Sequence, residues 1–170
     1  MPSPVGHALG GIAVGWGIAP RRDWRAAAVL AVVAAAPDLD LLVGDHRGFS
    51  HSVGAACIAG AIAWVITRRP RWGVAVALAW ASHVLLDWMS HDTRPPIGVM
   101  AFWPLTRDYY KSSLDVFPAV SRRYWLAEFW VYNLKALLVE FVILAPIAAI
   151  VVWLTPRNRG KTRTVSRRGR

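Results

Sequence analysis

Five long apolar runs limit the folds that this chain of 170 residues can adopt. They cover residues 8–19, 26–36 with an extension to 44, 53–67, 72–89 and 136–154, and a weaker aromatic stretch covers residues 97–105. Helices that are apolar on all sides need either a large protein or a membrane around them, and a chain of this length cannot bury them all in one soluble core. We therefore predict an all-α, polytopic membrane protein with about five membrane-embedded helices.

The lengths of the runs predict that the helices enter the membrane to different extents. Only the last two runs approach the roughly 20 residues that span a bilayer core, so the shorter helices are expected to be tilted or partly embedded. The composition agrees with a membrane location, since 55% of the residues are apolar and ten are tryptophan. A cleavable signal peptide is not expected, because the N-terminus lacks a basic n-region and cleavage would remove His7.

Basic residues fall in alternate loops and predict the orientation of the chain. They follow the first, third and last apolar runs: Arg21, Arg22 and Arg25; Arg68, Arg69 and Arg71; and seven lysines and arginines after Pro156. By the positive-inside rule these segments are cytoplasmic, so the N-terminus and residues 38–51 and 87–130 face outward. This predicts a multi-pass protein of a bacterial-type inner membrane, with a helical membrane domain over residues 1–155 and an outward-facing site.

The basic tail, residues 156–170, is expected to be disordered and to contact anionic lipid in the cytoplasm. It lacks the aromatic interleaving or folded motif that nucleic-acid binding would need, so membrane lipid is the expected partner and nucleic acid is not.

All five histidines and five of the aspartates fall in four segments, HALGG, PDLD, DHRGFSHS and HVLLDWMSHD. His83 and Asp87 are four residues apart, which places both on one face of a helix. Pro37 tends to end the helix before it, which frees Asp38 and Asp40 to point the same way. Imidazole and carboxylate donors from several segments are typical of a zinc-type site. The alternative is that the histidines satisfy helix ends and the aspartates cap helices.

The same segments resemble a known family. HALGG, PDLD, HRGFSHS, HVLLDW and a later WPL, over about residues 5–105, are similar to the YdjM-type family of predicted membrane-bound, metal-dependent hydrolases. HRGFSHS after PDLD is the most specific piece. The resemblance implies a helical inner-membrane protein whose metal ligands are His7, Asp38, Asp40, His51, His83 and Asp87. We add His46, His91 and Asp92 as further candidate ligands.

Six donors exceed the three that a catalytic zinc usually takes from the protein. We therefore expect one or two divalent ions, most readily zinc, with Asp38 or Asp40 as a bridge between two ions, or some donors in an outer shell. One of these carboxylates would take the proton from a metal-activated water. Arg47 and Arg94 would then bind an anionic oxygen of the substrate, because guanidinium binds such oxygens in a bidentate fork. The alternative for these arginines is ion pairing with Asp45 and Asp92.

These residues predict a membrane-embedded metal-dependent hydrolase of esterase or phosphoesterase type, acting on an amphiphilic substrate such as a lipid at the outer leaflet. Two alternatives stay open, namely a metal or ion transporter and a non-enzymatic membrane protein stabilised by metal. Transport sites usually lie near the middle of the membrane, whereas these ligands are predicted at one boundary.

Four further features carry smaller expectations. Glu140, inside the last apolar run, should face protein, water or a partner, and could reach the metal site. Ser52 is expected to cap the helix that follows it, and Cys57 to be buried. The small residues of the first run should let its helix approach another closely; they are Gly10, Gly11, Gly15 and Gly17.

Overall fold

The computed structural model describes residues 1–42, 46–93, 95–121, 123 and 125–155. The elements are α1 (Pro4–Gly15), α2 (Trp24–Ala35), the short 3-10 helices η1 (Ala36–Leu42) and η2 (Phe49–His51), α3 (Val53–Thr67), α4 (Pro70–Trp88) and α5 (Glu128–Leu154). In the described ranges, strand-like pairing is limited to two isolated β-bridges. The all-α prediction is therefore confirmed.

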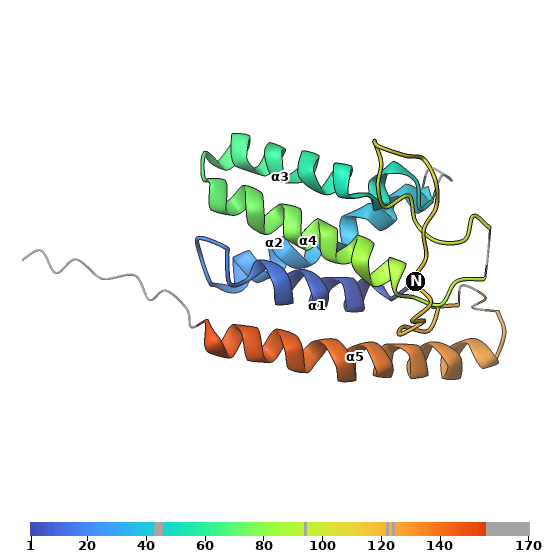
Figure 1. Ribbon diagram of the computed structural model, residues 1–170. Coiled ribbons are helices and arrows are strands. Elements are labelled where there is room, and N and C mark those ends of the chain that lie inside the picture. The colour runs from blue at the N-terminus through green and yellow to red at the C-terminus, as the bar shows by residue number, and fades with distance from the viewer. Residues whose placement is uncertain (43–45, 94, 122, 124, 156–170) are drawn as a thin grey trace, which may run out of the picture.

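Helix α1 lies at the centre of the bundle, where it contacts α2, α4 and α5, while α3 packs on α4 (Figure 1). The α1–α2 turn, the α3–α4 turn and the end of α5 share one end of the bundle, which we call the basic end. The N-terminus, the segment between α4 and α5, and the start of α5 lie at the opposite end, which we call the loop end (Figure 1). The antiparallel order of the helices thus collects the segments that carry the predicted ligands.

Two glycines of α1 allow the close packing at the centre. A Cβ atom at Gly11 would lie 2.4 Å from the Cβ of Ala34, and one at Gly15 would lie 2.5 Å from Leu30 Cδ2. Leu30 and Ala34 belong to α2 and are fully buried. The predicted small-residue surface of α1 is therefore used at these positions, whereas Gly17 has no such close neighbour.

The helix boundaries agree in part with the apolar runs. Helix α3 matches the run 53–67, but α5 begins at Glu128 and not at residue 136, because aromatic residues and Asn133 extend it beyond the strictly apolar stretch. Residues 97–105 form bends and turns and no helix, since Pro95 and Pro96 precede this segment and Pro104 interrupts it. The prediction for Cys57 was wrong, because it lies exposed on α3.

Among the described helices, α5 is the one that is both long and apolar enough to cross a membrane, with 27 residues. Helix α3 is apolar but has only 15 residues. The helical class is thus established, but the crossing of the membrane by about five helices is not.

Glu140 of α5 binds the start of α1 and does not reach the candidate metal ligands. Its side chain is 1% exposed and accepts hydrogen bonds from the backbone N–H of Ser3, at 2.7 Å, and from the Ser3 hydroxyl. The same hydroxyl accepts from the N–H of Gly6 and so caps α1. A Cβ at Gly6 would lie 2.6 Å from Glu140 Oε2, so the two helices meet closely here. The expectation that Glu140 could join the metal site was wrong, although its contact with protein was anticipated.

We expect Glu140→Ala to lower the melting temperature of the purified protein, because it removes the acceptor for two buried donors at the start of α1. Such a loss costs about 1–3 kcal/mol of unfolding free energy. Phe141→Ala is the control, since Phe141 is adjacent but 57% exposed. Equal melting temperatures for the two variants would contradict a structural role for the Glu140–Ser3 contact.

Candidate metal centre

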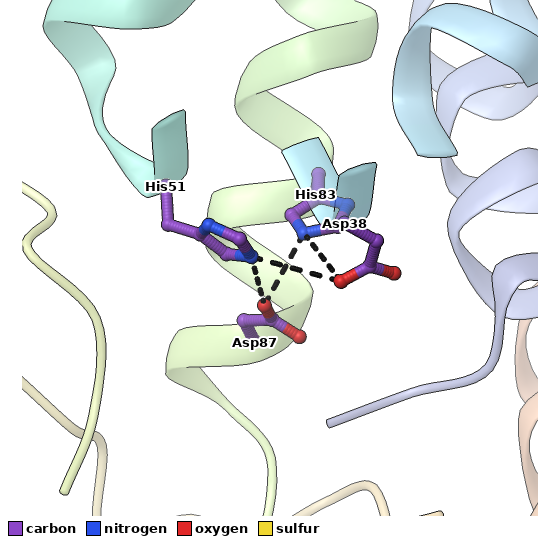
Figure 2. Close-up of side chains that lie close together, drawn as sticks. All are labelled: Asp38, His51, His83 and Asp87. Atoms are coloured by element: carbon purple, nitrogen blue, oxygen red, sulfur yellow. Dashed lines mark ion pairs between the residues drawn. The ribbon is translucent and has the colours of Figure 1, made fainter. Parts of the chain in front are cut away.

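Four side chains from three elements point toward one another near the C-terminal end of α4 (Figure 2). Asp38 comes from η1, His51 from η2, and His83 and Asp87 from successive turns of α4. One potential ligand atom of each lies within 4.8 Å of those of the others. Both histidines are 0% exposed and Asp87 is 3% exposed. We call these four residues the metal group.

The distances within the metal group suit ligands around one cation better than hydrogen bonds. His51 Nε2 and His83 Nε2 each lie 3.3 Å from Asp87 Oδ2, and they lie 3.7 Å and 3.8 Å from Asp38 Oδ1. Hydrogen bonds would be about 2.7–3.2 Å long. Ligands of a tetrahedral zinc, with bonds of about 2.0–2.2 Å, are separated by about 3.3–3.6 Å.

The atoms that face the centre of the metal group lack other partners. Within the described part of the chain, neither Nε2 atom, nor Asp38 Oδ1, nor either oxygen of Asp87 has a hydrogen-bond partner. Buried polar atoms are normally satisfied, and leaving one unpaired costs free energy. A divalent cation between them would satisfy both Nε2 atoms, Asp38 Oδ1 and Asp87 Oδ2 at once, so the residues present fit a metal.

The opposite ring nitrogens of the two histidines are held by acceptors. His83 Nδ1 donates to the carbonyl of Ala34 at 2.7 Å, and His51 Nδ1 lies 3.1 Å from Asp40 Oδ2. These acceptors keep the proton on Nδ1 and direct the lone pair of Nε2 toward the metal group. Ser50 strengthens the arrangement, because its hydroxyl donates to Asp40 at 2.7 Å.

Asp40 and His46 therefore lie behind the metal group. His46 Nδ1 is 2.6 Å from Asp40 Oδ1, and the backbone N–H of Arg47 donates to Asp40 Oδ2 at 3.1 Å. Asp40, His46 and His51 also form a possible metal-binding group of their own. However, its distances are those of hydrogen bonds, so the geometry favours a chain of hydrogen bonds that supports His51.

The pKa values follow from these contacts. Burial raises the pKa of Asp40, but hydrogen bonds from His51, His46 and Ser50 outweigh burial and hold it well below its usual range. Burial lowers the pKa of His51, but the nearby carboxylates of Asp38 and Asp40 outweigh burial and raise it to about 9. A proton on Nε2 and a metal ion there exclude each other, so metal uptake should release a proton.

His7 lies at the edge of the metal group, on α1. It is 0% exposed and its ring stacks on that of His83 with 3.7 Å between centroids. His7 Nε2 is 3.5 Å from Asp87 Oδ1 and 4.0 Å from Asp38 Oδ2. His51 and His83 lie closer to the other oxygen of each aspartate. Each aspartate therefore directs one oxygen toward His7 and the other toward His51 and His83.

Other candidate residues lie outside the metal group. Arg47 forms an ion pair with Asp92, whose Oδ2 also accepts from the N–H of Gly98 at 2.9 Å. His91 lies 3.1 Å from Asp115 and about half of its side chain is exposed. The structure thus separates His91 and Asp92 from the metal group, because α4 ends at Trp88 and the chain turns away. Arg94 and Asp45 fall outside the described residues.

Sequence reasoning missed the residues that position η2. The indole N–H of Trp80 donates to the carbonyl of Ser50 at 2.8 Å, which ties η2 to α4 next to His83. Ser52 directly precedes α3, and its hydroxyl accepts from the N–H of Ala55 at 3.0 Å, so the predicted cap is confirmed. Ser50 stands inside the HRGFSHS motif, but nothing in the spacing distinguishes it from Ser52.

The sequence model of the YdjM inner membrane protein family matches residues 1–159. The chain belongs to this family. The match extends well beyond the motifs around the metal group and includes all of α5. In this YdjM protein, the family description and the long apolar α5 both indicate a membrane location. No curated protein and no solved structure shows a significant match to the chain.

We expect His51→Ala to reduce the bound metal of the purified protein from about one equivalent or more to background, because it removes a buried ligand. Elemental analysis of the detergent-purified protein measures this. His91→Ala is the matched control. Because His91 lies outside the metal group, this variant should keep its metal. Unchanged metal in His51→Ala would refute the metal group.

Asp40→Asn should weaken metal affinity about 10- to 100-fold without abolishing binding, as expected for a carboxylate that orients a ligating histidine. Titration with a competing chelator measures the affinity. If Asp40→Asn lost its metal as completely as His51→Ala, Asp40 would itself be a ligand.

Proposed function

We propose that this YdjM protein is a membrane-embedded, metal-dependent hydrolase that acts on an ester or phosphoester of an amphiphilic substrate. The observation that carries this proposal is the metal group itself, whose buried nitrogen and oxygen atoms face one another without hydrogen-bond partners. It borders a large cavity, because Asp38 also lines that cavity. A metal site that meets a cavity is the arrangement that hydrolysis requires.

Zinc is the metal that the donor set favours, because imidazole suits zinc better than magnesium or calcium. One ion would be held by the metal group. A second ion could bind beside His7, where Asp87 and Asp38 offer their other oxygens. Bridging of two ions would then involve Asp38 and Asp87, and not Asp40.

Bound metal would supply Lewis acidity and lower the pKa of a water molecule. With one ion held through Asp38 Oδ1, Asp38 Oδ2 would remain available to accept a proton at the cavity, because the side chain of Asp38 is 15% exposed whereas that of Asp87 is fully buried. Arg47 lines the same cavity and is fixed there by Asp92. We assign it the stabilisation of negative charge on a substrate oxygen.

The arrangement of the helices supports a multi-pass topology with the site outside. The two arginine-rich turns share the basic end, whereas the metal group lies toward the loop end (Figure 1). The positive-inside rule then makes the basic end cytoplasmic. A site at one end of the bundle also disfavours transport, which usually uses a site near the middle of the membrane.

A non-enzymatic, metal-stabilised protein is the second candidate. Its support is the burial of the metal group, since four protein ligands without an open position are typical of structural zinc sites. Asp38 distinguishes the two candidates, because it lines the cavity and an enzyme would need that access for its substrate.

We expect Arg47→Ala to keep its metal but to lower turnover about 10²-fold or more, as loss of one group that stabilises developing charge does. Asp38→Asn should lose metal and activity together. A panel of lipid, carboxylester and phosphoester substrates, assayed with purified protein, measures turnover. Arg107→Ala is the control, because Arg107 does not line the cavity.

If no substrate in the panel is hydrolysed above a metal-stripped control, and both substitutions change only thermal stability, the structural role replaces the hydrolase.

A further inference from the structure

A cavity of about 1050 Å³ lies at the loop end of the bundle. Asp38, His46 and Arg47 line it next to the metal group. Leucines of η1 line one wall, and the residues around the start of α5 line the other. Pockets for drug-sized ligands usually measure about 300–1,000 Å³, so this one has room for a head group and part of a chain.

Both walls of the cavity are fixed by hydrogen bonds to the bundle. The bond from His83 to the carbonyl of Ala34 holds α2 against α4 directly before η1. On the other side, Asn133 of α5 binds Ser121 with both ends of its amide, at 2.8 Å and 2.9 Å. Asn133 is buried and Ser121 lines the cavity. The cavity is therefore part of the fold.

The chemistry of the lining changes from the metal group outward. Asp38, His46 and Arg47 belong to the metal group or lie next to it, whereas η1 and the segment around the start of α5 contribute the apolar side chains Leu39, Leu42, Leu126, Phe129 and Tyr132. Leu39 and Leu42 are 63% and 83% exposed, which would be unfavourable in water but suits contact with lipid chains. One end thus fits a polar group and the other fits a hydrocarbon.

The charges of the lining are mixed, and a bound cation would shift them in favour of an anionic head group. Two arginines, Arg47 and Arg123, line the cavity together with the acidic residues Asp38, Asp92 and Glu128. Asp38 belongs to the metal group and Asp92 is paired with Arg47. A cation in the metal group would add positive charge at the inner end, where a phosphate oxygen could reach it.

We propose that this cavity binds a membrane amphiphile with a phosphate-type head group, its head against the metal group and Arg47 and its chain between η1 and the start of α5. This inference rests on the proposed function, because it names the substrate class of the same site. The chain lies between Leu39 and Leu42 on one side and Leu126 and Phe129 on the other. The substrate therefore enters from the bilayer.

The test measures binding of dodecylphosphonate, which has the head and chain but cannot be hydrolysed, to the metal-loaded full chain in nanodiscs of zwitterionic lipid. Leu126→Trp fills the cavity and should weaken binding about 10-fold or more. Leu42→Trp fills it from the opposite wall and should do the same. Leu154→Trp, at the far end of α5, is the matched control and should bind as the unaltered protein does. Partitioning of the probe into the bilayer is the same for all variants.

Removal of metal by a chelator should abolish the binding that responds to these variants, because the head group lies against the metal. Equal affinity in the cavity variants and the control would overturn the proposal, and so would binding that survives the chelator. Binding that behaves as expected, without hydrolysis of any ester in the panel, would support the cavity assignment and refute the hydrolase function. Metal content, measured for each variant, separates a filled cavity from a damaged site.

Discussion

The cost of burying imidazole nitrogens and carboxylate oxygens without partners is the constraint on which the rest of this structure depends. The metal group places these atoms between η1, η2 and α4, whereas the main apolar core between α2 and α4 consists of alanine and leucine side chains. Apolar packing alone would not choose one register for these elements in a membrane, where lipid is as apolar as the side chains. Ligands that must meet at one point fix the register of these elements, because a shift of one helical turn would move a ligand about 5.4 Å away.

Further contacts hold the elements that supply the ligands in place. Asp40 holds His51, the carbonyl of Ala34 holds His83, and Trp80 holds η2 against α4. Each contact joins an element that supplies a ligand to a neighbour, so the metal group and the helix packing stabilise each other. Helix α5 is different, because it contacts mainly α1 and is joined to the loop end through Ser3 and Ser121. It contributes a wall of the cavity and no ligand.

Local sequence patterns predicted the parts of the site that depend on local geometry. The four-residue spacing of His83 and Asp87 fixed them on one face of α4, and Pro37 marked the change from α2 to η1 that presents Asp38. The all-helical class followed from the apolar runs. Long-range contacts were not predictable in this way: the placement of Asp40 behind His51 and the contact of Glu140 with Ser3 depend on how the helices pack. Ion pairing of Arg47 with an aspartate was expected only as the alternative to substrate binding, and the structure shows the pair with Asp92. Hydropathy also could not fix the start of α5, because polar and aromatic residues continue the helix beyond the apolar run.

The close approach of α1 to α2 at Gly11 links packing to chemistry. His7 stands one helical turn before Gly11 on the same helix, and it reaches the aspartates of the metal group only while α1 stays against α2. A methyl group at Gly11 would separate the helices and withdraw an imidazole that it does not touch. A genetic screen for loss of function should therefore recover substitutions of Gly11 as well as substitutions of the histidines. The side chain of glycine gives no sign of this shared cause, which is the loss of an imidazole at the metal group.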